Sequence, residues 1–135
     1  MSHESPVREL RVALTVDAYQ EALRFYRDAL GLPVLEEWEQ PTGSGAVLDA
    51  GRATLEVLST SQAELVDRLE VGARVAGTVR LALEVDDSTA TAEELTAAGA
   101  ERIGGPVVTP WRHRNVRLEA PDGMQLTLFT VLGDA

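Results

Sequence analysis

The chain has 135 residues, a formal net charge of −10 at pH 7 and 44% hydrophobic residues. Residues 1–135 suit a single domain with an apolar core, and the negative charge argues against a nucleic acid partner, because phosphates would be repelled. The chain contains neither cysteine nor lysine, which excludes disulfides, thiolate metal sites, cysteine nucleophiles and Schiff-base chemistry.

Two stretches of the sequence repeat one pattern. Residues 10–17 read LRVALTVD and residues 79–86 read VRLALEVD. Both alternate apolar and other residues with period two, and both end in an aspartate that opens a helical pattern. Residues 46–58 resemble residues 116–129 in the same way. The sequence therefore predicts two copies of one strand–helix–strands unit.

The first copy is expected over residues 8–60. Its helix begins after Asp17, with Gln20 at the capping-box position, and ends at Gly31. Residues 43–45, Gly-Ser-Gly, are expected to form a turn. Strands are predicted at residues 9–16, 33–39, 46–50 and 53–59.

Residues 61–77 are expected to link the copies. Ser61 and Glu64 form a capping box for a short helix at about residues 62–70. The second copy is expected over residues 78–131, with a helix at about 88–98. Its strands are predicted at residues 78–85, near 101–104, at 114–119 and at 124–131.

Three motifs carry a resemblance to a known family. Residues 24–32, RFYRDALGL, resemble the "FY…LG" signature of the vicinal oxygen chelate superfamily, which includes glyoxalase I, bleomycin resistance proteins and extradiol dioxygenases. Residues 98–101, AGAE, and 120–126, APDGMQL, resemble its second-half signatures. The resemblance covers residues 8–131. It implies an α+β fold of two βαβββ modules whose curved mixed sheets form a cleft, usually in a homodimer.

The resemblance also indicates where metal-dependent members hold their ion. Those positions are Arg11, Glu56, Arg80 and Thr127 in this chain. Only Glu56 is a good ligand, because arginine keeps its proton in proteins. Metal enzymes of this kind need three protein ligands and an open position. We therefore expect no bound metal and no cofactor.

The same alternation indicates which side chains face the cleft. We expect Arg11, Arg80 and Glu56 there, opposite the residues that pack under the helices. Two interpretations stay open. These charges either orient a ligand, or Arg11 or Arg80 pairs with Glu56 and replaces the metal as a structural contact.

Aromatic residues add further candidates. Trp38 and Trp111 each follow a predicted strand, near the expected mouth of the cleft, where they either contact a ligand or belong to the core or an interface. His113, in the cluster at residues 111–114, is either a general base or ring donor, or part of a solvated loop. No catalytic residue is assigned. The candidate ligand-binding residues are Arg11, Trp38, Glu56, Arg80, Trp111, His113, Thr127 and Phe129.

Three functions are compatible with these features. The first, which we favour, is metal-independent binding or sequestration of a small aromatic or amphiphilic molecule, with antibiotic resistance of the bleomycin-resistance type as one form. The second is an enzyme: either a glyoxalase- or dioxygenase-like lyase, isomerase or oxygenase with a degenerate metal site, or a metal-free lyase or isomerase that uses Glu56 or His113 as base. The third is a regulatory module with a vestigial cleft. The absence of metal-ligating residues at three of the four family positions, together with the expected fold, favours the first function.

The sequence also bears on cellular location and oligomeric state. No stretch approaches the roughly 18 apolar residues of a membrane helix, and residues 1–6 are polar, unlike a signal peptide. All twelve basic residues are arginine, a bias typical of GC-rich bacterial genomes. We expect a cytoplasmic bacterial protein that forms a homodimer, with no membrane partner.

Overall fold

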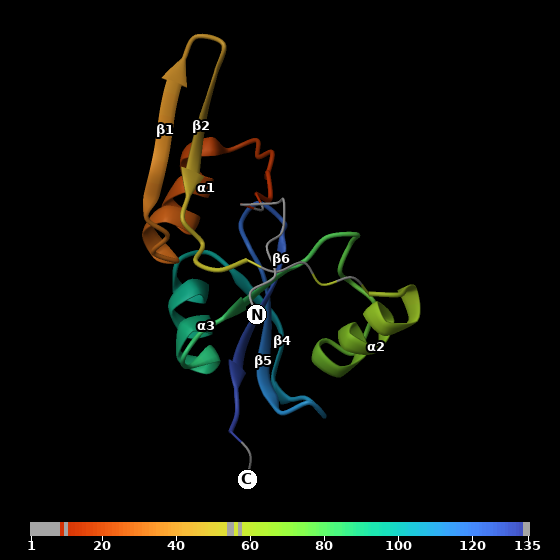
Figure 1. Ribbon diagram of the computed structural model, residues 1–135. Helices are drawn as coiled ribbons and strands as arrows, with labels where there is room; N and C mark the ends of the chain where they lie inside the picture. Colours follow the sequence, from red (N-terminus) through yellow and green to blue (C-terminus); the bar gives the residue numbers. More distant parts are fainter. Residues whose placement is uncertain (1–8, 10, 54–55, 57, 134–135) are drawn as a thin grey trace, which may run out of the picture.

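The second half of the chain forms one four-stranded sheet with a helix on it (Figure 1). The structure, a computed structural model, describes residues 9, 11–53, 56 and 58–133. The strands lie in the order β3-β6-β5-β4; β3 and β6 are parallel, and the other neighbours are antiparallel. The elements are β3 (Leu81–Glu84), α3 (Ser88–Ala97), β4 (Glu101–Val108), β5 (His113–Glu119) and β6 (Gln125–Val131).

This sheet has one apolar face because its strands alternate with period two. Val116 and Leu118 of β5 are fully buried, as are Leu126 and Leu128 of β6. They pack against Leu95 and other apolar residues of α3 in one core cluster. The Asp87 side chain caps α3 by accepting a hydrogen bond from the backbone N–H of Ala90 at 3.1 Å, one residue after Asp86, the aspartate that the repeated pattern indicates.

The first half of the chain has a different set of elements. A short helix, α1 (Tyr19–Leu23), continues as a π-helix, η1 (Arg24–Ala29). The strands β1 (Val34–Gln40) and β2 (Gly43–Leu48) then form an antiparallel hairpin, which projects away from the four-stranded sheet (Figure 1). Every residue of β1 is exposed.

Two predicted strands of the first copy do not form in the described residues. Residues 11–16 have no regular structure, and neither do residues 53, 56, 58 and 59; positions 54, 55 and 57 lie outside the described residues. In the second copy the matching segments are β3 and β6, which pair with each other. Alternation selects the face a side chain takes once a strand is paired, but it does not supply the partner.

The predicted turn at residues 43–45 is also wrong. Gly43–Leu48 is strand β2, and the turn lies at residues 41–42. Pro41 ends β1 because proline has no N–H for the ladder. Gly45 lies under the Trp38 ring across the hairpin, where a Cβ would overlap it. Glycine here serves close packing.

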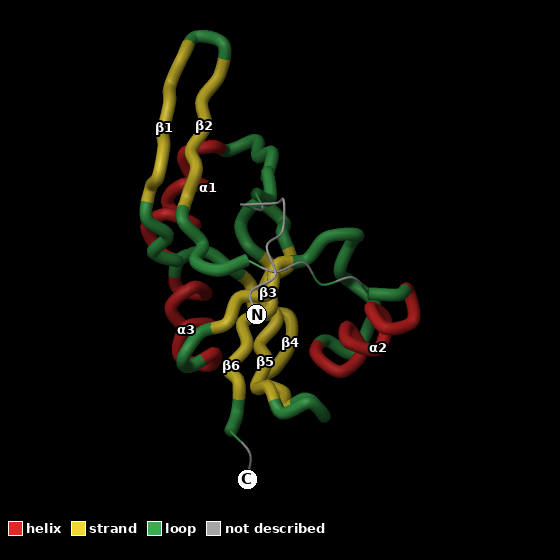
Figure 2. The backbone as a smooth tube through the Cα atoms, in the orientation of Figure 1, coloured by secondary structure: helices red, strands yellow, loops and turns green. Residues whose placement is uncertain are grey.

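Helix α2 (Thr60–Glu70) lies on the opposite face of the sheet from α3 (Figure 2). The Ser59 hydroxyl caps it, accepting from the Gln62 backbone N–H at 3.2 Å; the predicted capping residue, Ser61, is inside the helix. Among the described residues, no α2 side chain belongs to the hydrophobic core cluster. Its contacts with the sheet are therefore mainly polar.

The signature motifs of the two halves meet in space. Phe25 and Tyr26 of η1 are buried in the core and pack edge to face, with ring centroids 5.1 Å apart. The Tyr26 hydroxyl donates a 2.9 Å hydrogen bond to Asp122 in the turn before β6. Burial and this carboxylate raise the pKa of Tyr26. These residues hold the halves together.

The architecture confirms the α+β class, with helices packed on a mixed sheet. The limits proposed for the two modules and their linker, at residues 8–60, 61–77 and 78–131, stay predictions. Across the part of the chain that the structure describes, every helix is too short or too polar to cross a membrane.

Candidate functional site

The face of the sheet turned away from α3 is polar. Its side chains alternate with the buried leucines and valine of β5 and β6, and most of them are polar or charged. We call this surface the polar face. Its members are Arg80 just before β3, Ala82 and Glu84 on β3, His113, Asn115, Arg117 and Glu119 on β5, and Gln125, Thr127 and Phe129 on β6.

Arg117 is the centre of this face and is completely buried. Its Nη1 donates to Asp67 Oδ1 at 2.9 Å, and its Nε donates to Glu70 Oε1 at 3.1 Å. Its Nη2 lies 2.9 Å from the same Glu70 oxygen, at ion-pair distance but without hydrogen-bond geometry. Both carboxylates come from α2. This helix therefore contacts the sheet through a buried ion cluster.

Polar neighbours complete the shell of Glu70. Asn115 donates to its Oε2 at 2.8 Å, and the Thr127 hydroxyl donates to its Oε1 at 3.1 Å. Glu70 is 3% exposed, so this carboxylate is surrounded by donors and shielded from water. A buried charge needs such partners, because the desolvation of an unpaired ion costs roughly several kcal/mol.

Asp67 links the cluster to the chain that follows α2. Burial raises the pKa of this carboxyl, but the backbone N–H groups of Ala76 and Val75 and the side chains of Arg117 and Arg74 outweigh it, and the pKa falls to about 2. The two backbone N–H groups and Arg74 Nη1 each donate at 2.8 Å. Asp67 therefore stays ionised at neutral pH.

Arg80 is the second cation of the polar face. It is half-buried, and its Nη1 donates to the Thr127 hydroxyl at 2.7 Å. Burial, and then the charge of Arg117, lower its pKa, while Glu70 and Glu56 act in the opposite direction. The Arg117 guanidinium thus lies close enough to disfavour the charge of Arg80, on the same face of the sheet.

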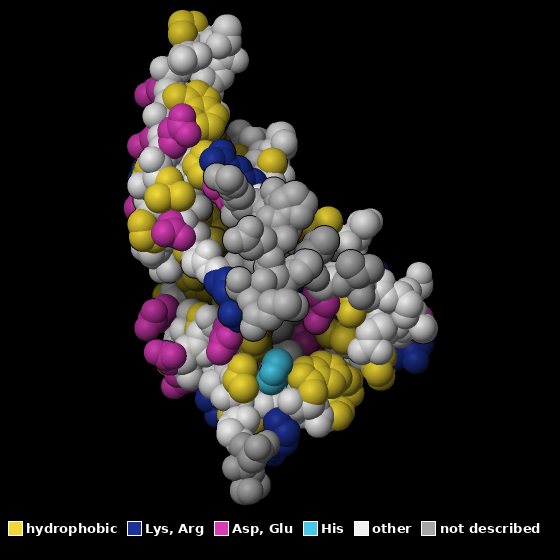
Figure 3. All heavy atoms as spheres, in the orientation of Figure 1, with side chains coloured by type: hydrophobic (Ala, Val, Ile, Leu, Met, Phe, Trp, Pro, Cys, Tyr) yellow, Lys and Arg dark blue, Asp and Glu magenta, His cyan; other side chains and the backbone are white. Residues whose placement is uncertain are grey.

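An aromatic pair lies at the other end of the polar face. The rings of His113 and Phe129 stack with centroids 5.0 Å apart and planes 17° from parallel. Both side chains are half-buried, and Trp111, in the turn before β5, is 42% exposed. Figure 3 shows histidine beside hydrophobic side chains, while acidic side chains gather along the hairpin and near α3. The His113 and Phe129 rings thus present a planar surface that is partly accessible.

The other predicted site residues lie apart from this cluster. Arg11 is exposed and pairs with Glu9. Trp38 is 41% exposed on the hairpin and covers Gly45. Glu56 is exposed and acts on Arg80 only through its charge. The structure thus brings Arg80, Thr127, His113 and Phe129 to one face, and their part in ligand binding stays a prediction.

The expected arginine–carboxylate pair does not form among the described residues, and a different pair is buried instead. The sequence interpretation paired Arg11 or Arg80 with Glu56, whereas the buried pair in the structure joins Arg117 to Asp67 and Glu70. Two signals could have found it. An arginine between Val116 and Leu118 lies on the polar side of its strand, and Asp67 and Glu70 are three apart on one helix face.

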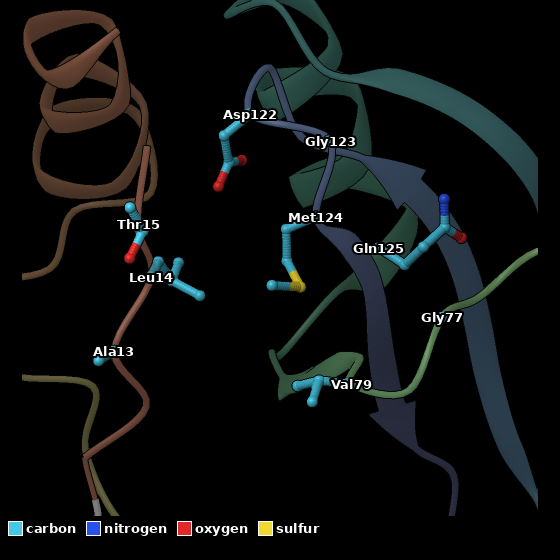
Figure 4. A pocket seen from close by; sticks show the side chains of 9 residues that line it. All are labelled: Ala13, Leu14, Thr15, Gly77, Val79, Asp122, Gly123, Met124 and Gln125. Atoms are coloured by element: carbon cyan, nitrogen blue, oxygen red, sulfur yellow. The ribbon is translucent and has the colours of Figure 1, made fainter. Parts of the chain in front are cut away.

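A hollow of about 340 Å³ lies between the two halves of the chain. Figure 4 shows Leu14 and Thr15 on one side and Met124 and Asp122 on the other. Gln125 also lines it and accepts from Arg117 Nη1 at 3.3 Å. The hollow therefore borders the polar face next to the ion cluster.

The residues present do not fit a divalent cation. Two of the four family positions carry guanidinium groups, and Arg80 donates to the side chain at a third, Thr127. Within the described ranges, no three or more His, Asp or Glu side chains are grouped to hold an ion. A cation placed here would meet the positive charge of Arg80.

The fold and this face define a class of protein. The profile of the Glyoxalase/Bleomycin resistance protein/Dioxygenase superfamily matches residues 10–128. The chain belongs to this superfamily, and it has the vicinal oxygen chelate fold.

Individual proteins are similar to this chain in sequence or in fold. The chain is 25% identical over 127 residues to YraH, an uncharacterized protein of Bacillus subtilis (strain 168), covering 91% of this chain and 98% of that protein. TnmS3, an antibiotic-binding protein from Streptomyces sp. CB03234, has a similar structure, with TM-score 0.63, 20% identity, and coverage of 96% of this chain and 100% of TnmS3. A superfamily member from Sphaerobacter thermophilus DSM 20745 gives TM-score 0.62 and 23% identity, with 92% and 98% covered.

Proposed function

We propose that this protein binds a small aromatic or amphiphilic molecule on the polar face, without a metal ion. The observation that carries the proposal is the half-buried His113–Phe129 stack on the same face as the Arg80–Thr127 contact. Rings supply planar apolar surface, and a few placed polar groups fix orientation, which is the usual make-up of a small-molecule site. Sequestration requires only such a surface and no reacting group.

Membership of the superfamily supports this proposal. TnmS3 is an antibiotic-binding protein with the same fold, so the fold can serve binding. The poor match to metal ligation at Arg80 and Thr127 favours binding over metal-dependent catalysis. We propose antibiotic sequestration, of the bleomycin-resistance type, as the physiological form of this binding in the cytoplasm.

A ligand panel tests the proposal. Polycyclic aromatic natural products and bleomycin-type antibiotics are titrated into the protein by isothermal titration calorimetry in excess chelator. We expect saturable binding by at least one planar compound, unchanged by the chelator. If no compound binds, small-molecule binding is wrong and the vestigial cleft becomes the better explanation. If a compound binds and is converted, the lyase or isomerase alternative, with His113 or Glu56 as base, replaces sequestration.

Variants locate the binding. Phe129→Ala should weaken binding about tenfold, because stacking contributes about 0.5–1.5 kcal/mol beyond the buried area. Trp111→Ala should weaken it more than Trp38→Ala, since Trp111 precedes His113 and Trp38 lies on the hairpin. Circular dichroism checks that each variant is folded. Equal affinities in all three variants and the wild type would show that the ligand binds elsewhere.

Assembly is the second part of the proposal. We propose a homodimer in which a second copy covers the hairpin. Val34, Leu35 and Trp38 of β1 are 41%, 63% and 41% exposed, and large apolar side chains gathered on one strand are normally covered. Light scattering at micromolar concentration should give twice the mass of one chain, and Leu35→Glu should halve it. A monomeric wild type would contradict the dimer.

A further inference from the structure

The donors around Glu70 have the composition of a carboxylate-binding site. A guanidinium (Arg117), an amide (Asn115) and a hydroxyl (Thr127) all donate to this one side chain, at 3.1, 2.8 and 3.1 Å. We call these three residues the donor set. All three are on β5 or β6. Their exposed fractions are 0%, 4% and 2%, so each is at least 96% buried. They belong to the sheet, whereas the carboxylate they hold belongs to α2.

The charge of the sheet points the same way. Arg80 and Arg117 put two cations on the polar face. Burial and the charge of Arg117 lower the pKa of Arg80. The carboxylates paired with Arg117, Asp67 and Glu70, both come from α2. Without these two side chains the buried Arg117 has no ion-pair partner among the described residues, in a chain whose net charge is −10. An anion is the complementary ligand.

Helix α2 has little apolar contact with the sheet. Of its three buried residues, only Val66 is apolar, and the other two are Asp67 and Glu70. Leu65 is 47% exposed, and no described α2 residue belongs to the core cluster. The hydrophobic effect scales with buried apolar area, so it contributes little here. A helix held by charges can be displaced by a competing charge.

We propose that the donor set is a carboxylate-binding site, that Glu70 fills it as an internal ligand, and that an aromatic carboxylate competes with Glu70 for it. The inference rests on the small-molecule binding proposed above and names the class of ligand. The ligand places its carboxylate at the donor set and its rings over the His113–Phe129 stack. Thr127 and Phe129 are two residues apart on β6, which is about 7 Å along a strand. An aryl carboxylate of two fused rings spans that length.

The first experiment compares two probes of the same shape. Naphthalene-2-carboxylate and naphthalene-2-carboxamide are titrated into the wild-type protein by calorimetry. We expect the carboxylate to bind at least tenfold more tightly, because only it carries the charge that the donor set holds in Glu70. Equal affinities would overturn the carboxylate site while leaving small-molecule binding intact. No binding of either probe or of the natural-product panel would overturn both proposals.

The second experiment removes the internal ligand. Glu70→Gln deletes the competing charge and should raise the affinity for naphthalene-2-carboxylate about tenfold, since apparent affinity scales with the open fraction. Glu64→Gln is the matched control, because Glu64 is on the same helix and its ion pair among the described residues is with exposed Arg68. An unchanged or lower affinity in Glu70→Gln than in Glu64→Gln would overturn competition.

A glycine offers a way to open the site without changing a charge. A Cβ added at Gly104 of β4 would lie 1.9 Å from the backbone carbonyl oxygen of Glu70. Gly104→Ala should therefore push the end of α2 from the sheet and raise the affinity for naphthalene-2-carboxylate. Gly133→Ala is the control, because its Cβ meets nothing within 4 Å. Equal affinities in these two variants would contradict the displacement of α2.

The wild-type protein provides a readout that needs no variant. Saturating naphthalene-2-carboxylate should speed amide hydrogen exchange across α2 and leave exchange in α3 unchanged. This result identifies α2 as the element that the ligand displaces. Unchanged or slower exchange in α2 at saturation would show that Glu70 stays in place, and the inference would be wrong.

Discussion

Helices α2 and α3 cover opposite faces of one sheet, but different forces hold them. Leu95 and Ala92 of α3 enter the core cluster with the leucines of β5 and β6. The buried residues of α2 are Val66, Asp67 and Glu70, and its contacts are with a buried arginine. Burial of apolar area is the main source of stability. The contacts of α3 therefore supply most of the stability. The contacts of α2 contribute less to stability, so they can determine which ligand binds.

The largest effect should come from the α3 side. Leu95→Ala should lower the free energy of unfolding by about 3 kcal/mol, because Leu95 is 1% exposed and its removal leaves a cavity. Leu65→Ala makes the same chemical change on α2, where the side chain is 47% exposed, and should cost less than about 0.5 kcal/mol. Urea denaturation measures both. Similar losses would show that the helices are held alike.

The buried ion cluster should respond next. Glu70→Gln should lower stability by about 2–3 kcal/mol, because Arg117 loses part of its charge balance in a site buried from solvent. Glu70→Leu combined with Arg117→Met should recover much of this loss if the two groups interact. Denaturant midpoints of the single and double variants decide it. Strictly additive changes would mean that the ion pair contributes nothing of its own.

Acid should loosen the α2 side through Asp67. Its pKa of about 2 lies below the ordinary value of 3.8, so the folded state binds the proton less readily than the unfolded state. The resulting stability, about 2 kcal/mol at neutral pH, is fully present above about pH 5 and is lost as the pH falls towards 2. Asp67→Asn should flatten this part of the stability–pH curve. Parallel curves for variant and wild type would contradict it.

The smallest effect concerns the contact between the halves. Tyr26→Phe keeps the packing of the ring and removes the hydroxyl that donates to Asp122 at 2.9 Å. We expect a loss of about 1 kcal/mol, the usual net value of one hydrogen bond. Thermal unfolding followed by circular dichroism measures it. No change, with the same midpoint as wild type, would show that the bond is not formed in solution.

The sequence predicts the second copy well and the first copy poorly. Residues 79–86 and 116–129 both alternate with period two and both find partners, so their strands form near the predicted limits. Residues 10–17 carry the same pattern, yet the described residues 11–16 are not paired. A pattern within one segment reports which face would be buried. It carries no information on whether a partner strand is present.

The candidate site was predicted in part for a related reason. Period two correctly puts Arg80, Thr127 and Phe129 on one face of the sheet. The link between Arg117 and Glu70 joins residues 47 apart in the sequence, and it depends on how α2 docks. Charges on a helix and a strand do not indicate that they meet. The family positions drew attention to Arg11 and Glu56, whereas the buried ion pair joins β5 to α2.

The hydrogen bond between Tyr26 and Asp122 has a consequence for the order of folding. It closes a loop of 96 residues, and the entropy cost of closing a loop grows with its length. The sheet of the second half needs shorter connections, such as the hairpin of β5 and β6. We expect that sheet to form first and η1 to dock on it late. Tyr26→Phe should then speed unfolding and leave the refolding rate nearly unchanged.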